Sequence, residues 1–221
     1  LSEAEIPYKL LGNLGFGAHG FVEKVKDVTS GNCYARKTFR ADKTSLFKAQ
    51  EMLRLEVQII RELASHPHVI RVHATYISGR TLAIILQPVA DGGNLTQFLA
   101  DYRDLGEGHP DKLLNRQTLI RTFGCLAHSL EYLHSDSYPH KPVIRHKDIK
   151  PTNILIHEGS PIFTDFGISR RCIDNQTTTS GRPEVFTLRY CAPEVADYDD
   201  RNRKADVFSL GCVFLEILAS L

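Results

Sequence analysis

The sequence has no marked excess of either charge and no long hydrophobic run. Its 221 residues carry 27 Lys and Arg against 26 Asp and Glu, a formal net charge of +1. Nucleic-acid-binding proteins usually show a one-sided basic excess, so we expect no nucleic-acid partner. The most apolar stretch, residues 207–221, is short and contains Glu216, so we expect no membrane span.

The cysteines argue against a disulfide framework and against a structural zinc site, because they are odd in number, scattered and without a C-x-x-C pair. The five are Cys33, Cys125, Cys172, Cys191 and Cys212. No signal peptide opens the chain, and we expect an intracellular protein, cytoplasmic or nuclear. Because the sequence starts at Leu1 and stops within an apolar stretch, we expect both ends to be cut.

The first ninety residues are predicted to be strands with one helix. Short apolar or alternating runs predict strands at residues 8–14, 21–28, 33–39, 69–76 and 81–89. The apolar residues Met52, Leu55, Ile59 and Leu63 recur at helical spacing and predict a helix over residues 46–64.

The remaining residues are predicted to be mainly helical. A short helix is expected over residues 94–102, a longer one capped by Asn115, and an apolar helix from about Ala205. Two short strands are expected at residues 154–156 and 162–163. We therefore predict a strand-rich lobe, residues 1–90, and a helix-rich lobe, residues 91–221.

A glycine-rich turn, G-x-G-x-x-G-x-V, lies between the first two predicted strands and contains Gly15, Gly17, Gly20 and Val22. Glycines allow backbone N–H groups to approach phosphate oxygens. A dinucleotide-binding fingerprint requires a helix after the turn, whereas a strand is predicted here. Taken alone, the turn is as consistent with a plain hairpin as with a nucleotide site.

A lysine and a glutamate form a second candidate pair. Lys37 shares a strand face with Ala35, and Glu56 lies on the helix that follows. Such a pair can hold nucleotide phosphates. Without further context, a solvated surface lysine and a solvated glutamate are the commoner interpretation.

Four further motifs follow in order. H-x-D-x-K-x-x-N starts at His146, D-F-G at Asp165, T-x-x-Y-x-A-P-E at Thr187 and D-x-x-S-L-G at Asp206. Together with the glycine-rich turn and the lysine strand, these motifs show that the chain resembles the eukaryotic protein kinases over essentially its whole length.

The resemblance implies an α+β, bilobal kinase-like fold, with a small antiparallel sheet lobe carrying one helix and a mainly helical lobe that is incomplete at the C-terminus. Lys150 and Thr187 match the serine/threonine branch. We therefore expect a protein serine/threonine kinase that uses ATP, Mg²⁺ (with Mn²⁺ as a possible substitute) and a protein substrate. The alternative is a pseudokinase or nucleotide-binding scaffold. The oligomeric state is not predicted.

By the same resemblance, Asp148 accepts or orients the proton of the substrate hydroxyl, and Lys150 neutralises the γ-phosphate. Asn153 and Asp165 supply oxygen ligands to Mg²⁺. The residues expected to bind ATP are Gly15, Gly17, Gly20, Val22, Ala35, Lys37, Glu56, Gln87, Val89 and Leu155.

Two motif residues are expected to be structural rather than catalytic. His146 should pack against Phe166, and Asp206 should anchor the catalytic-loop backbone. Lys147 replaces the family's more usual arginine, which would grip a phosphorylated loop residue bidentately. We therefore favour a polar loop over a phosphorylation site for the hydroxyl residues Thr177, Thr178, Thr179 and Ser180.

Two expectations concern surfaces. Alternation along its strand should direct Arg36 to solvent. Family members continue with helices that cover the last apolar helix, so we expect an exposed apolar patch here. Its members are Val207, Phe208, Val213, Phe214 and Leu218.

Overall fold

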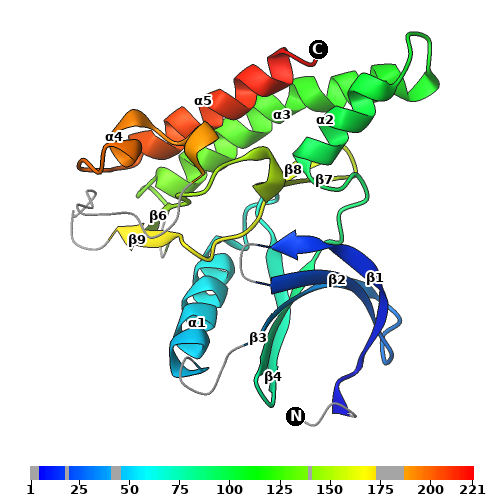
Figure 1. Ribbon diagram of the computed structural model, residues 1–221, viewed down its shortest axis with the longest axis vertical. Helices are drawn as coiled ribbons and strands as arrows, with labels where there is room; N and C mark the ends of the chain where they lie inside the picture. The colour runs from blue at the N-terminus through cyan, green and yellow to red at the C-terminus, as the bar shows by residue number, and fades with distance from the viewer. Residues whose placement is uncertain (1–4, 18–19, 41–45, 139–140, 173–186) are drawn as a thin grey trace. The chain divides into compact units, whose positions relative to one another are not determined.

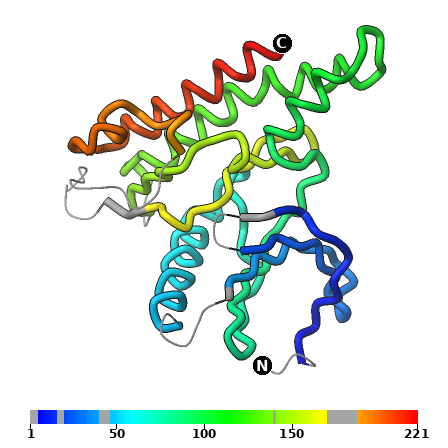
Figure 2. The backbone as a smooth tube through the Cα atoms, viewed as in Figure 1, coloured from blue at the N-terminus to red at the C-terminus, as the bar shows by residue number. Residues whose placement is uncertain are grey.

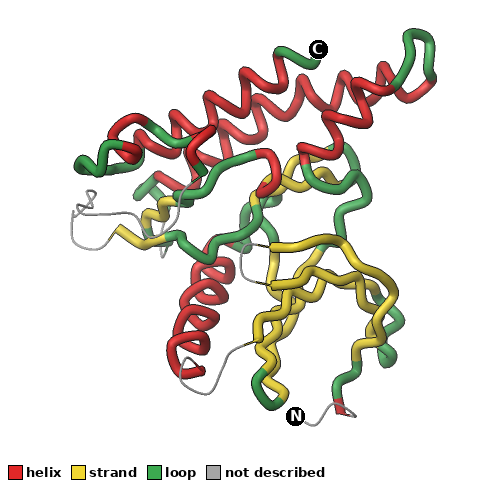
Figure 3. The backbone as a smooth tube through the Cα atoms, viewed as in Figure 1, coloured by secondary structure: helices red, strands yellow, loops and turns green. Residues whose placement is uncertain are grey.

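The computed structural model describes residues 5–17, 20–40, 46–138, 141–172 and 187–221. The chain divides into two compact units. The first comprises Leu1–Ala64 and Ile70–Val89, and the second comprises Ser65–Val69 and Ala90–Leu221. Strands dominate the first unit and helices the second (Figure 3).

The first unit is built on an antiparallel five-stranded sheet in the order β1-β2-β3-β5-β4. Its strands are β1 (Tyr8–Gly17), β2 (Gly20–Asp27), β3 (Cys33–Arg40), β4 (Arg71–Ser78) and β5 (Thr81–Gln87). The strands labelled in this unit form one curved sheet (Figure 1). The five predicted strands and the α+β class are confirmed.

The strand β5, which lies between β3 and β4, is buried from Leu82 to Leu86, as an apolar run of β-branched and aliphatic residues allows. On one face of the sheet a core forms from Val25, Tyr34, Tyr76, Ala83 and Ile85. Tyr8 packs on this cluster, with its ring stacked 6.2 Å from that of Tyr76.

The single helix of this unit, α1 (Leu46–Leu63), packs against β4 and β5. Its buried apolar residues are Val57, Ile59, Ile60 and Leu63. Met52 and Leu55 are 40% and 55% exposed, so the apolar stripe predicted from the sequence is wrong in its first half. The helix instead buries residues three and four positions apart in its second half, the last of which is Leu63.

The second unit contains most of the described helices and two pairs of short strands. Its helices are α2 (Leu95–Asp104), α3 (Pro110–His134), α4 (Pro193–Ala196) and α5 (Lys204–Leu218), with 3-10 turns η2 (Pro151–Asn153) and η3 (Leu188–Tyr190). Its strands are β6 (Val143–Arg145), β7 (Ile154–His157), β8 (Ser160–Phe163) and β9 (Arg170–Cys172). β6 pairs with β9, and β7 forms a hairpin with β8. The chain path can be followed by colour in Figure 2.

The long helix α3 starts at Pro110, so the predicted cap at Asn115 is wrong. His109 is the N-cap, and its Nδ1 accepts the N–H of Asp111 at 3.2 Å. Proline suits the first helical position, because its missing N–H is not needed there and its fixed φ is already helical. The helix therefore begins five residues before the predicted cap.

The last helix, α5, lies along α3 (Figure 1) and buries Leu210, Val213 and Ile217. Phe214 packs on Phe123, with ring centroids 4.7 Å apart. Val213 is fully buried and Phe214 packs on Phe123 of α3, so neither residue is part of an exposed patch.

Three other members of the expected patch are exposed as predicted, namely Val207, Phe208 and Leu218, at 56%, 44% and 57%. Among the helices of the described residues, none is both long and apolar enough to cross a membrane.

Candidate functional site

Lys37 and Glu56 form a buried ion pair within the first unit. The Lys37 Nζ lies 2.8 Å from the Glu56 Oε1, and the side chains are 6% and 5% exposed. β3 is paired on both sides, so Lys37 lies within the sheet, opposite Val22 on β2. The surface interpretation of this lysine and glutamate is therefore wrong.

The glycine-rich turn joins two antiparallel strands. Gly17 ends β1 and pairs with Gly20, which starts β2; residues 18 and 19 lie outside the described part of the chain. Gly15 has φ 144°, a conformation that L side chains rarely adopt. A Cβ on Gly20 would lie 1.7 Å from the carbonyl oxygen of Thr38. Because a strand follows the turn, the dinucleotide fingerprint does not apply.

The remaining residues predicted to contact ATP lie in both units. Ala35 pairs with Leu86 between β3 and β5. Gln87 ends β5, its peptide bond to Pro88 is cis, and Val89 is the last residue of the first unit. Leu155 lies on β7 in the second unit, where it bridges to Asn94.

Arg36 does not point into solvent as expected. Arg36 lies on the opposite face from Lys37, but that face carries the core that contains Tyr34 and Tyr76. Its Nε and Nη2 lie 3.0 and 2.8 Å from the Glu23 Oε2, and its Nη1 lies 3.3 Å from the Tyr76 hydroxyl. Strand alternation predicts the face of a residue, but not whether other side chains cover that face.

In the second unit, Asp148 and Lys150 converge with Asn153 and Thr187. The Lys150 Nζ lies 2.8 Å from the Asp148 Oδ2, and the Asn153 Nδ2 donates to the same oxygen at 2.8 Å. The Thr187 hydroxyl donates to the Asp148 Oδ1 at 3.2 Å and accepts from Lys150 at 3.1 Å. The carboxylate is thus fixed by an amide, an ammonium and a hydroxyl.

The β7–β8 hairpin places Asn153 opposite the residue before Asp165. Ile154 pairs with Phe163, and the Thr164 N–H donates to the Asn153 carbonyl at 3.0 Å. Asp165 has φ 63°, an uncommon left-handed conformation for a residue other than glycine. The Asn153 Nδ2 is committed to Asp148, so the amide oxygen is the atom of this side chain suited to a cation.

Among the described residues, no group of three or more His, Cys, Asp or Glu could hold a metal ion. Mg²⁺ fits a sparser donor set, because it keeps several waters and binds proteins through one or two carboxylates together with substrate phosphates. An asparagine oxygen and one aspartate therefore suit Mg²⁺ better than they suit a cation that needs a full protein cage.

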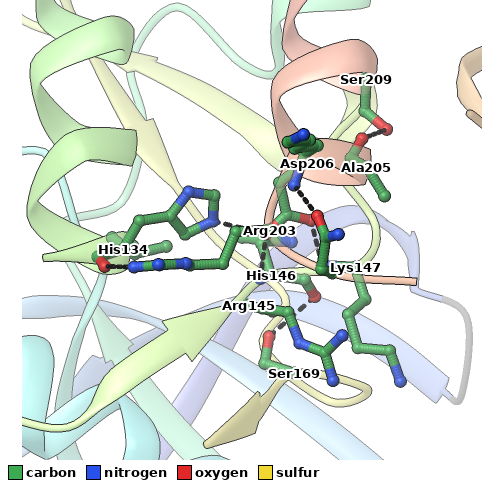
Figure 4. A network of polar contacts seen from close by, with 12 residues as sticks. His134, Arg145, His146, Lys147, Ser169, Arg203, Ala205, Asp206 and Ser209 are labelled. Carbon is green, nitrogen blue, oxygen red and sulfur yellow. Dashed lines mark hydrogen bonds and ion pairs between the residues drawn. The ribbon is translucent and has the colours of Figure 1, made fainter. Parts of the chain in front are cut away.

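Asp206 anchors the backbone at His146 and Lys147, as the sequence predicted (Figure 4). Its carboxylate accepts the N–H groups of His146 and Lys147, both at 2.8 Å, and lies 2.9 Å from the His134 Nε2. Lys147 has φ 71°, so these bonds hold a strained backbone one residue before Asp148. Burial alone would raise the pKa of Asp206. The hydrogen bond from His134, together with the charges of His134 and His146, nevertheless holds this pKa below its usual value.

His146 is fully buried and packs on Phe166, with ring centroids 4.7 Å apart. This contact was also predicted. The ring Nε2 lies 3.0 Å from the Thr164 carbonyl, and the Ser169 hydroxyl donates to the His146 carbonyl at 2.9 Å. Burial lowers the pKa of His146 despite the neighbouring carboxylates, so the ring is neutral at neutral pH. A neutral, packed ring supports a structural role.

Two contacts of this site were missed at the sequence level. Thr187 was recognised only as a marker of the serine/threonine branch, although its position in T-x-x-Y was a usable signal. His134 ends α3, and nothing in its sequence neighbourhood indicates a bond to Asp206. The hydroxyl cluster of residues 177–180 lies outside the described part of the chain.

A family model for the protein kinase domain matches residues 8–221, so the chain belongs to the protein kinase domain family. The human serine/threonine-protein kinase Nek10 is 29% identical over 218 residues, covering 95% of this chain and 17% of that protein. The human cAMP-dependent protein kinase catalytic subunit PRKX is 30% identical over 213 residues, covering 96% of this chain and 53% of that protein.

A bacterial relative shows the same level of similarity. The serine/threonine-protein kinase PknB of Mycobacterium leprae is 30% identical over 215 residues, covering 96% of this chain and 32% of that protein. The chain therefore spans between 17% and 53% of the length of these three relatives.

Proposed function

We propose that this chain is the catalytic domain of an active protein serine/threonine kinase, which transfers the γ-phosphate of ATP to a Ser or Thr hydroxyl of a protein substrate. The observation that carries the proposal is the hydrogen bond from the Thr187 hydroxyl to the Asp148 Oδ1 beside Lys150. In it, a threonine hydroxyl already donates to the proposed catalytic carboxylate. In kinases a carboxylate accepts the proton of the substrate hydroxyl, and the Asp148 carboxylate already accepts a hydrogen bond from a hydroxyl.

The proposed transfer step forms one bond to phosphorus and breaks another. The substrate oxygen forms a bond to the γ-phosphorus while the bond from that phosphorus to the bridging oxygen of ADP breaks. Asp148 orients the hydroxyl and receives its proton, and Lys150 neutralises charge on the transferred group. Asn153 and Asp165 would hold Mg²⁺, which when bound neutralises charge on the phosphates.

The first unit would hold the nucleotide. Lys37, fixed by Glu56, would bind the α- and β-phosphates, and the backbone of Gly15, Gly17 and Gly20 would approach the phosphate oxygens. Within this unit, the adenine ring would contact the apolar side chains of Val22 and Ala35. It would bond to the Gln87 carbonyl and the Val89 N–H.

The test is transfer of radiolabelled phosphate from ATP to a generic protein substrate by the purified protein, compared with Asp148→Asn. Loss of the carboxylate should lower the rate by about 10²-fold or more, because general-base groups contribute about 10²–10⁴-fold. Asp101→Asn, an exposed position on α2, makes the same change of charge away from the site and should keep the parent rate.

The other outcomes are equally informative. Equal transfer by the parent and by Asp148→Asn would overturn the catalytic assignment. No transfer by either, with ATP still bound, would favour the pseudokinase or scaffold alternative.

A further inference from the structure

An exposed cation follows the proposed catalytic residues along the chain. The Thr187 hydroxyl lies 3.2 Å from the Asp148 carboxylate, and the turn η3 begins at the next residue. Successive Cα atoms lie about 3.8 Å apart, so the Arg189 Cα is within about 8 Å of that of Thr187. The Arg189 side chain can therefore reach residues that flank an acceptor hydroxyl at Asp148.

Arg189 is supported from one side while its charge stays accessible. Its Nη2 lies 3.8 Å from the Glu216 Oε1, and its guanidinium carbon lies 5.7 Å from the centre of the Tyr190 ring. The side chain is nevertheless 73% exposed. A guanidinium has five N–H donors, so this long contact leaves donors free for a ligand.

The carboxylate beneath Arg189 is already engaged. The Glu216 side chain is 17% exposed, and its Oε2 accepts a hydrogen bond from the Tyr190 hydroxyl at 2.8 Å. Burial, together with this bond, raises the pKa of Tyr190 to about 12, so the tyrosine remains a donor at neutral pH. The Glu216 carboxylate thus has one oxygen bonded to the Tyr190 hydroxyl and the other beside the Arg189 guanidinium.

We propose that Arg189 is a specificity residue, which binds an Asp or Glu side chain close to the acceptor Ser or Thr of the substrate. This inference rests on the proposed function, since it needs a peptide at Asp148. Charge-assisted bonds from arginine to carboxylates are among the stronger polar contacts.

The test uses peptides with one serine in a neutral background, with Asp, Gln or Lys at each of three positions on either side. The measured quantity is the kcat/KM ratio of the Asp peptide to the Gln peptide, taken within each variant so that a general loss of activity cancels. A charged hydrogen bond predicts a ratio of about 10 at one position for the parent. Arg189→Gln should bring this ratio to about 1, and Arg189→Glu should favour the Lys peptide.

Arg80→Gln is the matched control, because Arg80 is exposed in the turn between β4 and β5 and should keep the parent ratio. A parent ratio near 1 at every position, or an unchanged ratio in Arg189→Gln, overturns the inference. Peptide binding by fluorescence anisotropy separates this failure from that of the proposed function. If no variant transfers phosphate, a binding preference for the Asp peptide that Arg189→Glu reverses still supports the role of Arg189, and equal binding overturns it.

Discussion

The Nζ of Lys37 and the Oε1 of Glu56 lie 2.8 Å apart in a buried position, although the residues come from different elements, β3 and α1. Removing two charges from water is costly, and their attraction offsets this cost only while both are present. The pair therefore has two roles that can be measured separately, namely its contribution to the free energy of unfolding and the proposed contact of Lys37 with phosphate.

A single substitution should show how much the ion pair contributes to folding. Glu56→Ala removes the carboxylate that lies 2.8 Å from the buried Lys37 ammonium, and we expect a loss of about 3–5 kcal/mol in the free energy of unfolding. The double variant Lys37→Met with Glu56→Leu replaces the pair by apolar side chains and should regain most of this loss without regaining phosphate transfer. Urea unfolding and the transfer assay measure both. Glu51→Ala, an exposed change on the same helix, should cost less than about 0.5 kcal/mol.

Thr187 should contribute to catalysis through the orientation of Asp148. Thr187→Val keeps the shape of the side chain but removes the hydroxyl that lies between Asp148 and Lys150. One hydrogen bond of ordinary strength corresponds to about a tenfold loss in kcat. Thr187→Ser restores the hydroxyl and should restore most of the rate. Equal kcat in the valine and serine variants would show that the hydroxyl has no such role.

Asp206 should matter for both stability and rate. Asp206→Asn keeps the volume but replaces one acceptor oxygen by an NH₂ group, which cannot accept from the His146 or Lys147 backbone. Lost bonds to a buried carboxylate predict a loss of about 3 kcal/mol in the free energy of unfolding. The left-handed backbone of Lys147 then loses its support, so kcat should fall as well. Asp104→Asn, exposed at the end of α2, should change neither, and a parent-like Asp206→Asn would contradict this role.

The sequence predicted the elements of the fold well because their signals are local. Alternation identified the strands of the first sheet, and helical spacing identified α1. The errors concern the start of α3, the strands β6 and β9, which were not predicted, and the partners of individual side chains. The position of Arg36 on its strand was predictable, but the cover provided by Glu23 and Tyr76 depends on how the strands pair.

The candidate site shows the same division. Motif order made Asp148, Asn153 and Asp165 candidate site residues, because the resemblance assigns roles to fixed positions. The bond from His134 to Asp206 joins residues 72 positions apart, and no local pattern records such a contact. Likewise, the burial of Val213 and Phe214 depends on which face of α5 meets α3.

Gly20 should tolerate no side chain. A Cβ there would lie 1.7 Å from the Thr38 carbonyl, so Gly20→Ala must open the β2–β3 pairing where the glycine-rich turn ends. Overpacking of this kind costs about 1–3 kcal/mol. ATP affinity should fall in parallel, because the displaced backbone is part of the proposed phosphate site. Gly12→Ala is the control, since nothing lies within 4 Å of its added Cβ. Thermal melts and a fluorescent ATP analogue measure both effects, and equal behaviour of the two variants would contradict the prediction.

His66 should make the stability of the protein depend on pH. Its ring stacks on Tyr132 at 4.7 Å, its Nδ1 accepts the His68 N–H at 3.3 Å, and its Nε2 lies 3.2 Å from the His128 Nδ1. With Nδ1 as an acceptor, the neutral ring carries its proton on Nε2 and donates to His128. A second proton would face the His68 N–H. Burial, followed by the charges of His68 and His128, lowers the pKa of His66 to about 4.

The direction of the pH effect follows from this lowered pKa. As pH falls below about 6.5, His66 becomes protonated in the unfolded chain, whereas in the folded protein it stays neutral until about pH 4. The free energy of unfolding therefore falls across this pH window. Between about pH 7.5 and pH 5 the loss from this group is on the order of 2 kcal/mol. His66→Phe keeps a ring against Tyr132 but cannot titrate, so urea unfolding should show lower stability at the higher pH and a smaller fall on acidification. His146 adds a loss of the same sign in both proteins, so the difference between them isolates His66. Parallel pH profiles for the two proteins would show that His66 is not the responsible group.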